Sequence, residues 1–225
     1  LECYFDCSSP WTYLCFEAVQ PIAMRHDVAI EWHPILVGGI FNSVNPSVYA
    51  QREQPVPAKA AYARKDLQDW TRLIGIEIGT PAVFPVNSVK VMRGALLALE
   101  YGLLVPWARA AFRAYWGALR DISQEPVLRA IAEESGLDAD EVVEWVESDA
   151  ARQQLRENTE ALIARGGFGS PTLFVDGDDM YFGNDRLVLV DAALARSTVE
   201  TTAGTTAGTT AGTTAGSRVE RGAAR

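Results

Sequence analysis

Residues 6–14, DCSSPWTYL, contain the side chains best placed for chemistry in the N-terminal part of the chain. A short apolar run precedes them and a helical pattern follows, so Ser9 is a predicted helix N-cap and Pro10 the first helical residue. A Cys-Pro-x-Cys redox motif at this helix start would place cysteines where the chain has Ser9 and Thr12. The segment therefore has the setting of a thiol site, with hydroxyl groups in place of sulfur.

The cysteines and histidines offer no stronger candidate. Cys3, Cys7 and Cys15 are an odd number, at spacings that suit neither a disulfide framework nor a zinc site. Cys7 is close to the helix start, but at the end of a predicted buried strand it is expected to be a packed thiol, as are the other two. His26 and His33 flank a predicted strand and are expected at the surface rather than as catalytic bases.

Composition limits the partners that the protein is expected to have. A net charge of −9 gives no electrostatic reason to expect nucleic acid or an acidic membrane surface. The hydrophobic content of 48% suffices for a core, and no apolar run is long enough for a membrane span. The chain starts in a strand-like stretch without a basic-then-apolar signal, so we expect a cytoplasmic protein.

The predicted order of elements begins with strand, helix and strand. A buried strand ends at Asp6, and helical spacing covers 10–25, where Pro21 is expected to bend or shorten the helix. Alternating apolar residues predict a strand over 27–35. A long loop rich in Gly, Asn and Pro is expected over 38–57.

Helical patterns then dominate residues 58–165, and one of them starts at a capping box formed by Asp138 and Glu141. Two short strands follow, separated by a hairpin signal at residues 176–178. A closing helix over 184–196 has Asn184 as its candidate N-cap. The order βαβ, helices, ββα is that of a thioredoxin-like α/β fold interrupted by a helical insertion.

This order predicts three parts of the chain. Residues 1–41 and 166–197 are assigned to a thioredoxin-like domain, and 42–165 to a loop plus a helical insertion domain. From Thr201 to Gly216 the sequence Thr-Thr-Ala-Gly is repeated four times. That run has no apolar face to bury, so 198–225 are predicted to be a disordered tail outside the fold.

Three separated segments resemble kappa-class glutathione transferases and bacterial 2-hydroxychromene-2-carboxylate isomerases, which belong to the DsbA-like branch of the thioredoxin superfamily. YFDCSSPWTYL is similar to their aromatic-Asp-x-x-Ser-Pro-x-x-Tyr/Trp-Leu opening, and PAKAAYARKDLQDW to their Pro-x-Lys-x-x-Tyr-x-x-x-Asp-Leu helix. GGFGSPTLFVDGDDMYFGNDRL is similar to their closing Phe-Gly-x-Pro-Thr … Phe-Gly-x-Asp-Arg-Leu signature. The three matches follow the family order and span nearly all of the predicted fold.

The resemblance implies a glutathione-dependent isomerase that acts on a small aromatic substrate in the breakdown of naphthalene-like compounds. A kappa-like glutathione transferase is the alternative, because the two groups share all three motifs. A non-catalytic glutathione-binding module is a third reading. Thiol–disulfide exchange is disfavoured, because Ser9 cannot form a mixed disulfide. Dimerisation is common in such relatives, but the sequence identifies no interface for a homodimer.

By resemblance, Ser9 is the catalytic residue, and glutathione supplies the sulfur. N–H groups and the dipole at a helix N-terminus lower the pKa of a nearby thiol, and a hydroxyl that donates to the sulfur stabilises the thiolate further. Ser9 is then a hydrogen-bond donor and not itself the nucleophile. Ser8 competes for this role, but Pro10 fixes Ser9 at the helix start. A plain N-cap without chemistry explains the same residue types.

The closing signature implies further glutathione contacts. Pro171 is expected to be cis, as in thioredoxin folds, so that the Ser170 backbone pairs with the main chain of the glutathione cysteine; the alternative is a trans proline that opens an edge strand. Asn184 and Asp185, at a predicted helix N-terminus, are expected to hold the γ-glutamyl end, with Asp185 taking its ammonium group. Simple helix capping by these two residues is the alternative.

Three residues of the insertion complete the predicted site. Asn45 and Lys59 match glutathione-contacting residues of the family, with Lys59 suited to the glycyl carboxylate, although the stretch between them is longer than in these relatives. Lys90 is the candidate for the carboxylate of the aromatic substrate, and Arg93 is its rival.

Removal of residues 198–225 should leave the activity of the enzyme unchanged, because the repeat contributes nothing to the predicted core or site. Specific activity of the truncated and full-length proteins, measured at equal concentration, checks this. A large loss on truncation would contradict the assignment of the repeat to a dispensable tail.

Overall fold

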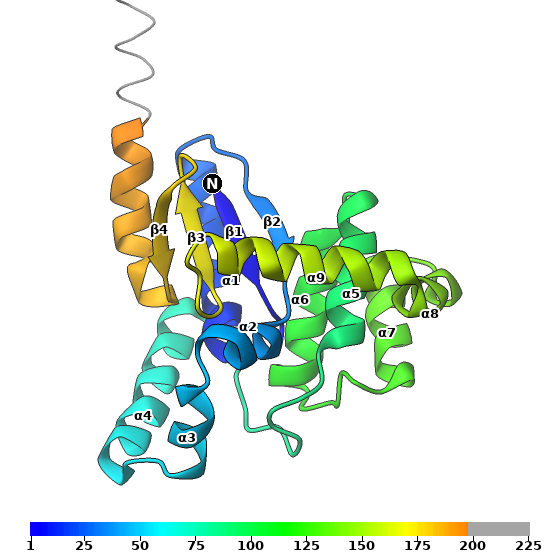
Figure 1. The fold of residues 1–225 in the computed structure, drawn as a ribbon, viewed down its shortest axis with the longest axis horizontal. Coiled ribbons are helices and arrows are strands. Elements are labelled where there is room, and N and C mark those ends of the chain that lie inside the picture. Colours follow the sequence, from blue (N-terminus) through cyan, green and yellow to red (C-terminus); the bar gives the residue numbers. More distant parts are fainter. Residues whose placement is uncertain (198–225) are drawn as a thin grey trace, which may run out of the picture.

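The computed structural model describes residues 1–197, in which a four-stranded sheet is covered by helices (Figure 1). The strands are β1 (Glu2–Phe5), β2 (Glu31–Pro34), β3 (Thr172–Val175) and β4 (Asp179–Phe182), in the order β2-β1-β3-β4. β1 pairs parallel to β2 and antiparallel to β3, and β3 pairs antiparallel to β4. This sheet confirms the predicted thioredoxin-like combination of βαβ and ββα units.

The central strand β1 is buried on both faces, because its side chains alternate between two apolar layers. Cys3 and Phe5 belong to the main core, which includes residues of α1 (Pro10–Arg25). Tyr4 points to the opposite face, where it belongs to a smaller cluster with Ile40 and Leu162. The carboxyl end of β1 therefore emerges between two covered faces, beside the start of α1.

The segment between β2 and β3 is almost entirely helical (Figure 1). A π-helical segment, Arg113–Gly117, continues α6 directly. The α-helices are α2 (Val37–Val44), α3 (Ser47–Glu53), α4 (Pro57–Ile74), α5 (Val89–Glu100), α6 (Leu104–Phe112), α7 (Glu125–Ser135), α8 (Ala139–Glu147) and α9 (Asp149–Ala164). Figure 1 shows α5–α8 gathered beside the sheet, α9 running across it, and α3 with α4 projecting from the body.

Several local predictions are confirmed. Ser9 caps α1 by accepting a hydrogen bond from the Thr12 N–H, and Pro10 is the first helical residue. Asp138 caps α8 through the N–H groups of Asp140 and Glu141. The hairpin between β3 and β4 turns at the predicted residues, 176–178. Helix α1 is not shortened by Pro21 and runs to Arg25.

The loop predicted over 38–57 is wrong, because this stretch contains α2, α3 and the first residue of α4. Gly, Asn and Pro gave it a loop-like composition, but α2 is stabilised by contacts that local sequence does not reveal. Ile40 is fully buried, and the Val37 N–H at the start of the helix donates to the Asp6 carboxylate. Helix α3 has no buried residue.

Two element starts also differ from the prediction. β2 begins at Glu31 instead of residue 27, because Asp27 adopts a left-handed conformation with φ 55° and Val28 still bonds to α1. Asn184 is not a helix N-cap but the first residue of a 3-10 turn, Asn184–Arg186, which leads into a helix over 187–197.

No helix within residues 1–197 is long and apolar enough to cross a membrane. The division of the chain at residues 41 and 166 stays a prediction. The predicted disordered tail, 198–225, lies outside the described residues.

Gly94→Ala should destabilise the protein by about 1–2 kcal/mol, although alanine is the better helix former. Gly94 is buried in α5, and an added methyl group would overlap the Trp107 ring. That ring is fully buried and donates its Nε1–H to the Val91 carbonyl at 3.1 Å, so it cannot move freely. Urea unfolding measures the change.

Gly117→Ala is the matched control, because a methyl group there meets nothing within 4 Å. Equal stability of wild type and Gly94→Ala would show that α5 and α6 do not pack as closely as described.

Candidate active site

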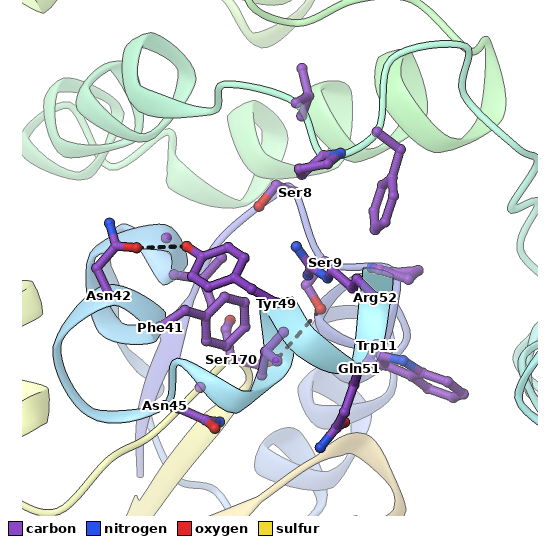
Figure 2. A pocket seen from close by; sticks show the side chains of 18 of the residues that line it. Ser8, Ser9, Trp11, Phe41, Asn42, Asn45, Tyr49, Gln51, Arg52 and Ser170 are labelled. Carbon is purple, nitrogen blue, oxygen red and sulfur yellow. Dashed lines mark hydrogen bonds between the residues drawn. The ribbon is translucent and has the colours of Figure 1, made fainter. Parts of the chain in front are cut away.

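A cleft of 1190 Å³ opens at the carboxyl end of β1 (Figure 2). Its walls come from the start of α1, from α2–α4, from the segment that precedes α5 and from the loop before β3. Arg52 and Lys59 are the charged residues that line it, and no Asp or Glu does, among the residues that the structure describes. The cleft is therefore suited to an anionic ligand, although the chain as a whole is acidic.

Ser9 lies in the cleft with its hydroxyl directed toward Ser170 (Figure 2). The Ser9 Oγ accepts from the Thr12 N–H at 3.2 Å and donates to the Ser170 carbonyl at 3.4 Å. This second bond is long and therefore weak, so the hydroxyl proton is readily redirected to a ligand. The Trp11 N–H, at the open end of α1, has no acceptor within residues 1–197. The helix start thus offers two donors to a negatively charged atom.

The Ser170–Pro171 peptide bond is cis, as predicted, and the trans alternative is wrong. Ser170 Oγ is used internally: it accepts from the Asp6 N–H at 3.1 Å and lies 2.8 Å from Thr12 Oγ1. The backbone N–H of Ser170 has no acceptor in the described part of the chain. Because Ser170 lines the cleft, its main chain remains available to an extended ligand.

A buried carboxylate holds these parts together. Asp6 is fully buried and accepts hydrogen bonds from the Ser8 N–H and the Val37 N–H, each at 2.9 Å, and from the Ser88 hydroxyl at 3.1 Å. Burial raises the pKa of Asp6 above its ordinary value, while the three hydrogen bonds act in the opposite direction. Sequence reasoning treated Asp6 only as a strand end and missed this positioning role.

Asn45 and Lys59 both line the cleft, as their predicted roles require. The Asn45 Nδ2 donates to the Phe168 carbonyl at 3.2 Å, and its Oδ1 accepts from Ser47. Asn45 thus ties the end of α2 to the loop before β3. Lys59, near the start of α4, has no ion pair within residues 1–197.

The turn that carries Asn184 and Asp185 lies next to the cis proline, because the Gly183 N–H donates to the Pro171 carbonyl at 3.1 Å. Pro171 and the two turn residues do not line the cleft itself. Asn184 is buried, and its Nδ2 has no hydrogen-bond partner in the described chain. The Asp185 carboxylate forms an ion pair with Arg186 at 2.5 Å.

Lys90 is not brought to the cleft. Its ammonium group pairs with Glu147 at 2.6 Å, and its rival Arg93 donates to the Val146 carbonyl at 2.8 Å, so both side chains are directed toward the end of α8. The structure therefore gives no support to a substrate-binding role for Lys90.

Arg52 is the cleft residue that sequence reasoning missed. Its guanidinium carbon lies 5.4 Å from the ring centroids of both Phe41 and Phe84. No sequence pattern indicated Arg52, because it falls in a stretch predicted as loop and its two aromatic partners are 11 and 32 residues away along the chain.

The cysteines and histidines are outside the cleft. All three cysteines are buried, and burial raises the pKa of Cys7 far above its ordinary range. His26 contacts Asp191 at 2.6 Å, and the partly buried His33 stacks on Tyr4. Within residues 1–197 there is no group of three or more potential ligands that could hold a metal ion.

Comparison with known proteins places this architecture in a family. Residues 1–195 match the DsbA-like thioredoxin domain. The chain is 30% identical over 203 residues to a 2-hydroxychromene-2-carboxylate isomerase from Pseudomonas putida, a match that covers 87% of this chain and 94% of that protein. The chain belongs to the 2-hydroxychromene-2-carboxylate isomerase and kappa-class glutathione transferase family of DsbA-like proteins.

Two further relatives agree with this membership. Human glutathione S-transferase kappa 1 is 27% identical over 209 residues, which cover 84% of this chain and 88% of that protein. The solved structure of a 2-hydroxychromene-2-carboxylate isomerase superposes with a TM-score of 0.76 at 27% identity, over 89% of this chain and 97% of the other. In this DsbA-like protein no cysteine reaches the cleft, so thiol chemistry there requires a sulfur from a ligand.

Asp6→Ala should lower the free energy of unfolding by about 2–4 kcal/mol, because it leaves two part-buried backbone N–H groups and the buried Ser88 hydroxyl without their acceptor. Urea unfolding measures the loss, and Asp178→Ala, on the exposed β3–β4 turn, should show none.

The effect of Asp6→Ala should also depend on pH. Because the folded-state pKa of Asp6 is raised, the folded protein holds this proton more tightly than the unfolded chain does. The stability contributed by the group is greatest below the ordinary aspartate pKa and falls as the pH rises toward the folded-state pKa. The gap between wild type and variant should therefore be larger near about pH 4 than near about pH 7. A gap that widens with rising pH would contradict the raised pKa.

Proposed function

We propose that the protein is a glutathione-dependent isomerase of the 2-hydroxychromene-2-carboxylate type, which acts in the cytoplasm on intermediates of naphthalene-like aromatic breakdown. The observation that carries this proposal is the position of Ser9, whose hydroxyl lies at the N-terminus of α1 in a cleft without carboxylates. The name and 30% identity of the bacterial relative support the same reaction class.

The residues around the cleft fit glutathione, an extended tripeptide with a thiol, two carboxylates and an ammonium group. The unpaired Ser170 N–H suits the main chain of its cysteine, which would lie beside Ser9. Lys59 suits the glycyl carboxylate, and Asn45 lines the same cleft as a second glutathione contact. The orphaned, buried Nδ2 of Asn184 is a donor that lacks an acceptor, which the γ-glutamyl carboxylate would provide. Asp185 would take the ammonium group.

Glutathione bound there supplies a nucleophilic sulfur that adds reversibly to a conjugated carbon of an open-chain enone, so that the former double bond rotates before the sulfur leaves. The Ser9 hydroxyl and the Trp11 N–H hold the negative charge of that sulfur. A hydrogen bond to a charged group contributes about 1.5–3 kcal/mol and a helix N-terminus about 0.3–1 kcal/mol. Together they lower a thiol pKa of about 8.5 by roughly 1–3 units, which makes thiolate abundant at neutral pH.

The kappa-like transferase would use the same thiolate on other electrophiles, so the acceptor side of the cleft distinguishes the two functions. That side carries Arg52, whose guanidinium carbon lies 5.4 Å from the ring centroids of Phe41 and Phe84. A cation near aromatic rings favours a planar anionic acceptor, as the isomerase reaction requires, over a neutral electrophile.

Ser9→Ala should lower isomerisation of 2-hydroxychromene-2-carboxylate by about 10- to 150-fold, because the thiolate loses a side-chain donor that contributes about 1.5–3 kcal/mol. Ultraviolet absorbance of the chromene and its isomer follows the reaction with and without glutathione. Ser8→Ala, which removes a neighbouring hydroxyl from the same cleft, should retain most of the activity.

Ser9→Asp separates chemistry from helix capping. Aspartate is as good an N-cap as serine, so α1 should remain stable, but its negative charge opposes a thiolate and activity should be lost. Activity that persists without glutathione, or that survives both Ser9 substitutions, would overturn the proposed mechanism. Glutathione binding without turnover of any chromene or electrophile would identify a non-catalytic binding module.

A further inference from the structure

A second pocket, with a volume of 760 Å³, lies against α1. Its walls come from α1, from the segment after α4, from α6 with its π-helical continuation, and from the last turn of α7. Within the described part of the chain it shares no lining residue with the cleft, so it is a separate place on the molecule. Four small lining residues leave room for a ligand: Gly75, Ala114, Gly117 and Ala118.

The charged groups of this pocket balance one another, in contrast to the basic cleft. The described lining contains three arginines and three glutamates. Arg109 donates to the Glu17 carboxylate through two hydrogen bonds of 2.8 and 2.9 Å. Arg113 lies 3.4 Å from the Glu134 carboxylate in a second ion pair. These four groups therefore satisfy one another without a ligand.

Arg120 and Glu77 are the other two charged lining residues, and neither forms an ion pair with any residue of the described chain. The Arg120 N–H donates to the Ala114 carbonyl at 2.8 Å, which ties this residue back to the π-helical segment. Glu77 belongs to the segment that follows α4, on another wall. The pocket therefore offers one unpaired cation and one unpaired anion from different walls.

Tyr13 adds a hydroxyl group that also lacks a partner. The residue is only 4% exposed, and its ring stacks on Phe112 with centroids 4.8 Å apart and planes 4° from parallel. Burial raises the pKa of the Tyr13 hydroxyl, and four charged residues of the lining add smaller shifts, so the hydroxyl faces the charged side of the pocket. No residue within 1–197 forms a hydrogen bond with it. Because buried hydroxyl groups normally have a partner, this one points to a ligand.

A ligand that satisfies all three groups must carry a negative and a positive charge close together. A carboxylate would accept from the edge of the Arg120 guanidinium and from the Tyr13 hydroxyl, while an ammonium group would donate to Glu77. A simple anion such as phosphate would leave Glu77 unmatched and would be repelled by it. An apolar lining residue, Ile76, and the small residues beside it suit a short aliphatic side chain.

We propose that this pocket binds a free α-amino acid with an aliphatic side chain, through Arg120, Tyr13 and Glu77. The site is distinct from the cleft and does not depend on the proposed function. Its failure would leave the isomerase assignment untouched, and the reverse also holds.

Titration calorimetry of the full-length protein with three probes of one carbon frame tests this proposal. L-Leucine carries both charges, 4-methylpentanoate lacks the ammonium group, and 3-methylbutylamine lacks the carboxylate. Wild type should bind L-leucine about tenfold or more tightly than either analogue, because each analogue leaves one charged group of the pocket without its partner.

Three single substitutions assign the contacts. Arg120→Gln and Glu77→Gln should each weaken L-leucine binding about tenfold or more, and each should also abolish the preference for L-leucine over the analogue that lacks the matching charge. Tyr13→Phe should weaken L-leucine binding as well but leave urea unfolding unchanged, because the lost hydroxyl has no partner within the described chain.

Arg64→Gln is the matched control, because Arg64 is exposed on α4 and lines neither pocket. It should bind L-leucine as wild type does. Absence of saturable L-leucine binding to wild type, equal affinity for all three probes, or unchanged binding in Arg120→Gln would overturn the proposal. Binding that is lost in Lys59→Gln but kept in Arg120→Gln would place L-leucine in the cleft and overturn it as well.

Discussion

The site depends on one buried charge. The Asp6 carboxylate accepts hydrogen bonds from the turn that leads to Ser9, from the first residue of α2 and from Ser88 before α5. Its own N–H donates to Ser170 Oγ, beside the cis proline. Four segments that are distant in sequence thus meet at one residue at the end of β1. Burial makes a charge costly and raises the pKa of Asp6, and the three donors offset only part of that cost. Because all these bonds meet at one buried carboxyl group, that group fixes the geometry of the cleft walls relative to one another.

Because the cleft walls are fixed, the start of α1 can stabilise a sulfur atom that belongs to a ligand and not to the chain. Ser9 and Thr12 occupy the positions of a redox cysteine pair, yet both hydroxyls are engaged at the helix start: Ser9 caps the helix, and Thr12 supports Ser170. The three cysteines are packed in the core instead. We therefore interpret the N-terminal segment as a thiolate-binding site. In this interpretation the Ser9 hydroxyl stabilises the thiolate, and glutathione supplies the reactive sulfur.

The elements predictable from sequence are those governed by local patterns. The cap at Ser9, the order of strands and the hairpin follow from turn residues and periodicity, whereas the cis proline follows from the resemblance. Helix α2 was not predictable, because its stability comes from burial of Ile40 and from the distant Asp6. Arg52 was not predictable either, because only folding brings Phe41 and Phe84 near its guanidinium group. The roles of the predicted site residues stay predictions.

The pKa of the thiol of bound glutathione distinguishes a thiolate-stabilising Ser9 from a plain helix cap. Ultraviolet absorbance of the thiolate, titrated against pH for the complex with wild type and with Ser9→Ala, gives this value without reference to any substrate. We expect a pKa at least about one unit below the ordinary thiol value of about 8.5 in wild type, and a rise of about one unit or more in the variant. An unshifted pKa in wild type, or the same pKa in both proteins, would contradict it.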